Sequence, residues 1–250
     1  MDNHTDQDDE IEIELREPAV VAERVILLAS LLRRLAVEGG ADRGASAAQA
    51  EVFDEREWLR EQKLFSSLTD LERSVLEAPL GNIAESDRIA VSWQIEALAA
   101  LLWSLGRGPR LAPWHQADFA KSPLEIPAPW DDSRTWTAEA ALQPEETIAR
   151  ERDVAELWHW RATVESLSRS SSPRDRESFA SAIGETVTEA EQSGLLATVI
   201  AGDFAVDEVP VRELPDDRID DLLATTTQRL HALNWVCGFG ATWDAVPLDI

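Results

Sequence analysis

The segment that decides the fold spans residues 86–106 and reads SDRIAVSWQIEALAALLWSLG. Ser86 is a good helix N-cap, and Gly106 ends the apolar run. Between them the chain is apolar on nearly every helical face, as in a helix that other helices surround. We therefore predict a central core helix from about 87 to 105. Its single internal acid, Glu96, needs a partner, because an unpaired buried charge costs several kcal/mol.

Helical periodicity recurs on both sides of this segment. Pro18 suits the first turn of a helix, and Gly39 and Gly40 end the apolar run that follows it. Thr69 and Glu72 have capping-box spacing, so a short helix should follow them. Besides the central helix, the predicted helices cover residues 18–39, about 51–63, 70–79, 144–169, 174–193 and 215–237.

Two stretches depart from the helical pattern. Residues 198–211 contain short strand-like runs with Asp207-Glu208 at a turn position, which predicts a small β-hairpin. Residues 107–142 are rich in proline and tryptophan and should form a long irregular crossover. The predicted fold is mainly α: an acidic flexible tail, 1–15, precedes a single helical domain, 16–250, which carries the hairpin.

The charge balance limits the partners that this chain can bind. The formal net charge is −25, from 23 Lys and Arg against 48 Asp and Glu. An acidic surface repels phosphates, so we expect no nucleic acid and no membrane, and a basic protein as the partner. Cys237 is the single cysteine, which favours a reducing compartment. The acidic N-terminus is unlike a signal peptide and no apolar run is long enough to span a bilayer, so we expect a cytoplasmic protein.

The sequence lacks the motifs of common catalytic and cofactor sites. It contains no G-x-x-x-x-G-K, H-E-x-x-H, C-x-x-C or G-x-S-x-G. Glu156 and His159 have E-x-x-H spacing, but a di-iron bundle needs a second such pair, which is missing. We therefore predict no metal and no cofactor, and we favour a protein that is not an enzyme.

Four polar residues interrupt apolar helical stripes: Glu96, Arg161, Arg229 and Asn234. Structural pairing between helices is one explanation, with Arg161 and Arg229 as the best partners for Glu96. A second is a polar pocket that binds a ligand or carries out acid–base chemistry, and a third is that these residues face solvent. The ten tryptophans fit either core packing or a binding cage.

The C-terminal residues are more apolar than a disordered tail usually is. We predict that Trp243 and Asp244 fold back on the helix that carries His159. A partly buried Asp244 would need a donor, for which His159, His231 and Arg229 are candidates. The contact would be either a structural clamp or an acid–base pair. Together these arguments give the ligand-binding candidates Glu96, His159, Trp160, Arg161, Arg229, His231, Asn234, Trp235, Trp243 and Asp244.

Several segments are shared with a known family. They are SWQIEAL at 92–98 with LWSLG at 102–106, LQP at 142–144 followed by Asp153 and His159-Trp160, RLHALNW at 229–235, and WDAVPLD at 243–249. In these segments the chain resembles the DUF4272 family, a bacterial domain of unknown function, from about residue 20 onward. The chain departs from the family at Gln143 and Leu157, where arginine is expected, and at Ile250. The resemblance implies a fold and a cytoplasmic bacterial origin, but no reaction.

Two classes of function follow from these features. An interaction module, of adaptor or toxin-neutralising type, fits the acidic surface and the missing catalytic motifs. The alternative is a small-ligand-binding protein or enzyme with a Trp-lined polar pocket around His159, Asn234 and Asp244. A concave pocket at those residues would favour the alternative, and a flat acidic face with exposed tryptophans would favour the interaction module. The oligomeric state stays open.

Overall fold

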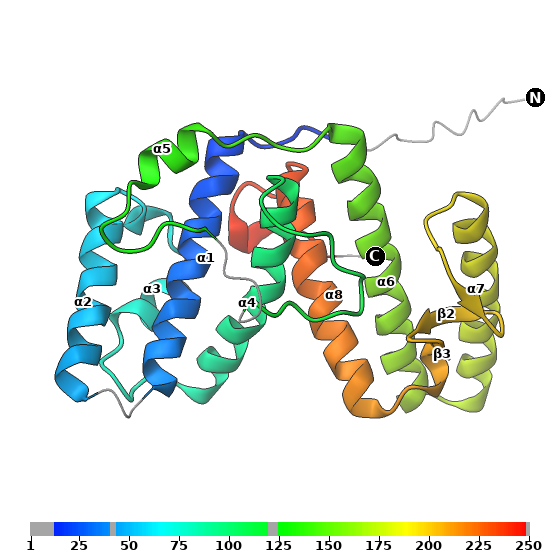
Figure 1. The fold of residues 1–250 in the computed structure, drawn as a ribbon. Coiled ribbons are helices and arrows are strands. Elements are labelled where there is room, and N and C mark those ends of the chain that lie inside the picture. Colours follow the sequence, from blue (N-terminus) through cyan, green and yellow to red (C-terminus); the bar gives the residue numbers. More distant parts are fainter. Residues whose placement is uncertain (1–12, 41–43, 120–124, 249–250) are drawn as a thin grey trace, which may run out of the picture.

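The computed structural model describes residues 13–40, 44–119 and 125–248. The fold is mainly helical with a small antiparallel sheet, as predicted (Figure 1). Within the described residues, none of the helices is both long and apolar enough to cross a membrane. The α-helices are α1 (Pro18–Gly39), α2 (Ala45–Glu61), α3 (Asp70–Glu77), α4 (Glu85–Ser104), α5 (Ser133–Ala138), α6 (Glu145–Ser170), α7 (Pro173–Gln192) and α8 (Asp216–Val236).

Helix α4 is the central element, as its sequence predicts. It packs between α1 and α8, and α6 packs on the far side of α8 (Figure 1). The second half of α4 is buried without interruption from Glu96 to Ser104. Helix α1 is buried from Val21 to Leu31 except at Glu23, and together with α4 and the end of α8 it forms the main core.

A second, smaller core lies between α6, α7, the sheet and the first half of α8. The sheet has the order β1 (Val199–Ile200), β2 (Asp203–Val206) and β3 (Val209–Pro210), all antiparallel. Asp207 and Glu208 connect β2 to β3 with φ of 49° and 68°. Positive φ at both positions is typical of tight two-residue hairpins, where glycine and asparagine are the usual residues. The predicted hairpin is confirmed, and so is the predicted short strand before it, which is β1.

Three predictions about the helices are wrong. Helix α4 begins at Glu85, after Ala84, so Ser86 lies inside the helix and is not its N-cap. Helix α2 begins at Ala45 rather than near residue 51, because this alanine-rich stretch favours helix more than its small, polar composition suggests. Helix α5 lies inside the predicted irregular crossover. It is short, and it begins where the Asp132 carboxylate accepts hydrogen bonds from the amides of Arg134 and Thr135. A polar turn and a capped single helical turn are hard to distinguish by periodicity alone.

The predicted tail, 1–15, falls mostly outside the described residues and stays a prediction. From Ile13 onward the chain packs on the main core. The Arg16 Nε donates to the carbonyl oxygen of Trp235 at 2.6 Å, and its guanidinium lies over the Trp235 ring. The segment before α1 is therefore attached to the end of α8.

Candidate functional site

Glu96 is buried at the contact between α4 and α8, with 1% of its surface exposed. The Nε and Nη2 atoms of Arg229 both donate to Glu96 Oε2, at 3.0 and 2.6 Å. The prediction that Glu96 is buried and paired with an arginine is therefore confirmed, and Arg229 is that arginine.

The same ion pair holds the irregular segment that follows α4. We call residues 107–119 the strap. The second oxygen of Glu96 accepts a hydrogen bond from the Ala117 amide at 2.7 Å. The paired arginine also donates to the carbonyl groups of Ala112 and His115, the former at 2.8 Å. Because the buried carboxylate and guanidinium need hydrogen-bond partners, these bonds fix the strap across α4 and α8 (Figure 1).

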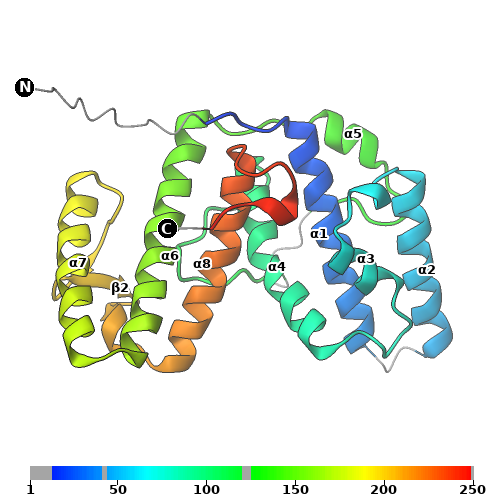
Figure 2. The same ribbon diagram turned by 180° about the vertical axis from the view of Figure 1, so that it is seen from behind.

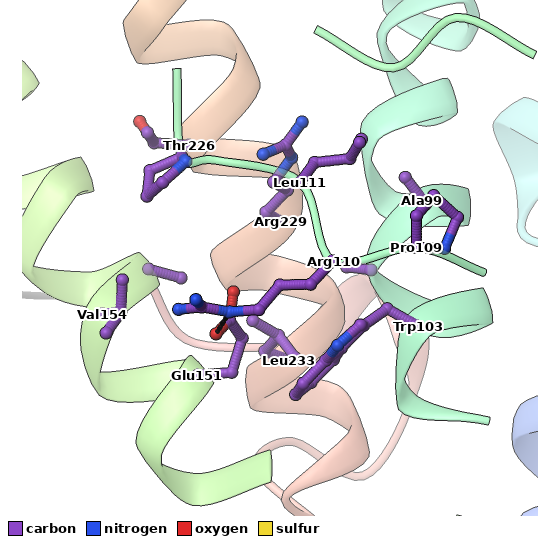
Figure 3. A pocket seen from close by; sticks show the side chains of 13 residues that line it. Ala99, Trp103, Pro109, Arg110, Leu111, Glu151, Val154, Thr226, Arg229 and Leu233 are labelled. Atoms are coloured by element: carbon purple, nitrogen blue, oxygen red, sulfur yellow. Dashed lines mark hydrogen bonds and ion pairs between the residues drawn. The ribbon is translucent and has the colours of Figure 1, made fainter. Parts of the chain in front are cut away.

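A small pocket with a cavity volume of about 30 Å³ lies under the strap, between α4, α6 and α8 (Figure 3). Its walls are mostly apolar and include Trp103, Leu111, Val154 and Leu233. The space exists because the facing helices present alanine where a core would hold larger side chains. These alanines are Ala99, Ala100 and Ala155.

An ion pair closes one edge of this pocket. The Nε of Arg110, on the strap, donates to Glu151 Oε2 of α6 at 2.6 Å (Figure 3). The Arg110 side chain is 60% exposed, so the pair contributes only about 0–1 kcal/mol and can open at low cost. The buried Glu96 pair thus anchors the strap, while the Arg110 pair closes its edge.

Arg161 does not meet Glu96, although the sequence allowed that pairing. It is fully buried on α6, where its Nε and Nη2 donate to the two carboxylate oxygens of Asp203 at 2.7 and 2.8 Å. Its Nη2 also donates to Glu165 at 3.0 Å. Arg161 therefore attaches the sheet to α6. Its role is structural pairing and not ligand binding.

The structure places His159 apart from Asn234, so the two do not share the predicted pocket. Asn234 Oδ1 accepts from Arg152 Nε at 2.9 Å. Arg152 and His159 both lie on α6, seven residues and about 10 Å apart along the helix axis. The Nδ1 atom of His159 is 3.2 Å from the Thr227 hydroxyl. Trp160 is half-buried on α6.

Trp243, in the C-terminal segment, folds back on α8 and α1, so the prediction that Trp243 and Asp244 fold back on the helix that carries His159 is wrong. Phe239 does reach that helix, with the Arg152 guanidinium 5.3 Å from its ring centroid. The Trp243 ring lies 4.5 Å from the His231 ring and 5.2 Å from the Trp235 ring. The guanidinium of Arg24, on α1, lies 4.3 Å from the Trp243 ring centroid. Figure 2 shows this segment on the face of the helix row opposite the strap.

Glycines explain why the chain turns back so soon after α8. Gly238 has φ of +88° and lies so close to the carbonyl of Glu14 that a Cβ atom would come within 2.4 Å of it. Gly240, with φ of +79°, is similarly close to the carbonyl of Ala245. Only glycine suits both positions, and the reversal directs Trp243 onto the nearest apolar surface, the end of α8.

The model of DUF4272, a domain of unknown function, matches residues 1–179. The chain belongs to this family. The match includes Glu96, the strap and the three pocket alanines, and it ends before Arg229 and the C-terminal segments that resemble the family. Searches of curated proteins and of solved structures found no match.

Several side chains of this DUF4272 protein that line or close the pocket are not among the residues that sequence reasoning singled out. They are Ala99, Ala100, Trp103, Arg110, Glu151 and Ala155. The sequence signal for this pocket is the group of alanines inside the apolar segment that forms α4. In the part of the chain that is described, no group of three or more His, Cys, Asp or Glu side chains is arranged to hold a metal ion.

His231 forms a structural contact rather than an acid–base pair. Its Nε2 lies 2.9 Å from the Trp243 carbonyl oxygen and donates to it, while Nδ1 is buried without a hydrogen-bond partner in the described chain. Burial lowers the pKa of His231 below its ordinary value, against the opposing effect of the hydrogen bond to Trp243. Asp244 is exposed, and no hydrogen bond joins it to His231 within the described residues.

This lowered pKa predicts a loss of stability in mild acid. As the pH falls below 6.5, the unfolded chain takes up a proton that folded His231 resists until its own lower pKa is reached. Urea unfolding at pH 5.5 and 7.5 measures the effect on the wild type and on His231→Gln. The wild type should lose more stability between the two pH values than the variant does. Equal losses would mean that His231 does not contribute.

Proposed function

We propose that this protein binds a small molecule in the pocket under the strap. The observation that supports this is an apolar space between three core helices, covered by a segment that a buried ion pair holds in place. Small-molecule sites are typically concave and mostly apolar, with a few polar groups that orient the ligand. The buried Glu96–Arg229 pair holds the cover in place, and the exposed Arg110–Glu151 pair at its edge would open to enlarge the small cavity for a ligand.

The lining favours an uncharged, flat, mainly apolar ligand. Trp103 and Leu233 offer apolar surface, and the edge at Arg110 and Glu151 offers one donor and one acceptor. The titratable groups around the pocket are paired with each other: Arg110 with Glu151, and Arg229 with Glu96. Groups already paired in this way suit binding better than proton transfer, so we propose a binding protein and not an enzyme.

Filling the pocket should abolish this binding. Ala100 is 8% exposed and faces the pocket, so in Ala100→Leu the larger side chain would occupy the space a ligand needs. We expect uncharged aromatic fragments to bind the wild type in ligand-observed NMR, and to bind the variant at least about tenfold more weakly. Ala180→Leu, at an exposed position of α7, is the matched control and should leave binding unchanged.

The Ala100→Leu variant must fold for the comparison to count. Overpacking a core costs about 1–3 kcal/mol, which a chain of this size tolerates. Circular dichroism and urea unfolding of each variant provide that check. The proposal fails if no fragment binds the wild type, or if a folded Ala100→Leu protein binds as tightly as the wild type does.

The interaction module is the second candidate, and one surface favours it. A groove with a cavity volume of about 390 Å³ runs between α1 and α2, and its rim includes Trp130, which is 67% exposed, beside Val52 and Asp54. An exposed tryptophan with acidic neighbours suits a basic, amphipathic partner. Titration with a lysine- and leucine-based helical peptide tests this, since Trp130→Ala should then weaken binding while Ala100→Leu should not.

A further inference from the structure

The wall of the pocket under the strap contains a buried polar group whose hydrogen bond is not made within the described fold. This group is the indole N–H of Trp103, a residue that is 8% exposed and lies across the pocket from Val154 (Figure 3). Its Nε1 atom donates no hydrogen bond to a described residue, yet it is not sealed from water as Nε1 of Trp58 is. The wall therefore presents a donor that a group of the size of water can reach.

The other polar side chains of this lining have partners of their own. Glu151 and Arg229 are ion-paired. The hydroxyl of Thr226 donates to a carbonyl group one turn earlier in α8, at 2.8 Å. An indole N–H is a donor only, so its missing partner must be an acceptor. That acceptor has to come from water or from a ligand.

The backbone of Trp103 is fixed at the end of α4. Its carbonyl oxygen accepts hydrogen bonds from Gln143 Nε2 at 2.5 Å and from the Gly106 amide at 2.8 Å. The indole ring also packs in the main core. A donor on a fixed ring loses little conformational freedom when it binds, so its hydrogen bond can discriminate between ligands.

Ligand entry changes the partner of this donor. In the free protein a cavity of about 30 Å³ has room for water, which can accept the hydrogen bond. A ligand that enters when the Arg110 pair opens displaces that water. A ligand without an acceptor then leaves the N–H group of Trp103 unpaired, which lowers its affinity. A ligand whose oxygen takes the place of the water keeps the hydrogen bond.

We infer that the ligand of this pocket is an uncharged aromatic carbonyl compound, whose oxygen accepts a hydrogen bond from Trp103 Nε1. This inference rests on the proposed function and names the class of ligand. A carbonyl oxygen accepts and does not donate, which matches an indole N–H. The aromatic part would contact the apolar side chains of Leu111 and Leu233. A carboxylate is disfavoured, because Glu151 at the pocket edge and the net charge of −25 would repel it.

Acetophenone and α-methylstyrene test this inference, because they have similar shapes and differ in having C=O or C=CH₂ beside the ring. Trp103→Phe removes the donor and keeps an aromatic ring. In ligand-observed NMR titrations it should weaken the binding of acetophenone by a factor about fivefold larger than that for α-methylstyrene. Trp160→Phe, at a half-buried position of α6 outside the pocket lining, is the matched control and should change neither affinity.

The wild type provides a second measurement, which does not require Trp103→Phe to fold. The indole proton signal of Trp103 should move further downfield with acetophenone than with α-methylstyrene, because hydrogen bonding deshields the proton. The inference is overturned if acetophenone does not bind, if the two ligands move this signal equally, or if Trp103→Phe weakens both by the same factor. The proposed function survives each of these results if other aromatic fragments bind and Ala100→Leu abolishes their binding, so the two can fail separately.

Discussion

Replacing Glu96 by alanine should destabilise the protein by about 3–5 kcal/mol. Arg229 is 7% exposed and would remain buried without a carboxylate to balance its charge. The Ala117 amide would lose its acceptor, so the strap would also lose a contact that holds it on α4. Urea unfolding of wild type and Glu96→Ala measures the loss, and hydrogen exchange at the Ala117 amide should become faster.

Glu151→Ala is the matched control for this experiment. It removes the carboxylate of the exposed Arg110 pair on the same strap, and surface pairs contribute only about 0–1 kcal/mol. The two variants should therefore differ by several kcal/mol. Similar small losses in both would show that the Glu96–Arg229 pair is not an anchor of the strap.

Replacing Arg161 by methionine should cost a similar amount, about 3–5 kcal/mol, for a different part of the molecule. The substitution leaves the carboxylate of Asp203, which is 1% exposed, without a counter-charge, while Glu165 keeps its ion pair with Arg169. Asp203 also accepts hydrogen bonds from the backbone amides of Phe204 and Arg212. Both the sheet and the segment after it should therefore be destabilised. Urea unfolding gives the free energy of the change.

Arg218→Met is the comparison for Arg161→Met. The Arg218 side chain is 48% exposed and lies 3.8 Å from Asp207, so its loss should cost less than about 1 kcal/mol. An Arg161 variant as stable as the Arg218 variant would contradict the view that Arg161 attaches the sheet to α6.

The helices are predictable from sequence because their signals are local. The apolar run around Glu96 predicts a buried helix, and an acid inside such a run predicts a buried partner. Thr69 and Glu72 form the predicted capping box, with both reciprocal hydrogen bonds. The apolar run does not indicate which helix lies beside it. Whether Arg161 or Arg229 pairs with Glu96 is therefore decided by long-range packing.

The candidate site was less predictable for the same reason. The strap has no periodicity, so its path across α4 and α8 follows from hydrogen bonds to Glu96 and Arg229 that only the folded chain shows. The alanines of the pocket look like ordinary core residues in a sequence. The direction of the C-terminal fold-back depends on two left-handed glycines, Gly238 and Gly240, which a pattern of hydrophobic residues does not reveal.

Glu72 makes long-range contacts that its place in the predicted capping box does not reveal. Besides its role in the capping box, it accepts hydrogen bonds from the buried guanidinium of Arg24 on α1, one of them at 3.0 Å. Burial lowers the pKa of Arg24, and the Glu72 carboxylate opposes that shift. Arg24 in turn lies over Trp243, so a local capping signal is connected to the C-terminal segment.

A crystal structure of the protein with its tightest-binding uncharged aromatic fragment tests the central proposal most directly. The proposal predicts the fragment under the strap, in contact with Ala100 and Ala155 and against Trp103, with the Glu96–Arg229 pair intact. A fragment bound only elsewhere, for example in the groove beside Trp130, would contradict the assignment of this pocket as the binding site.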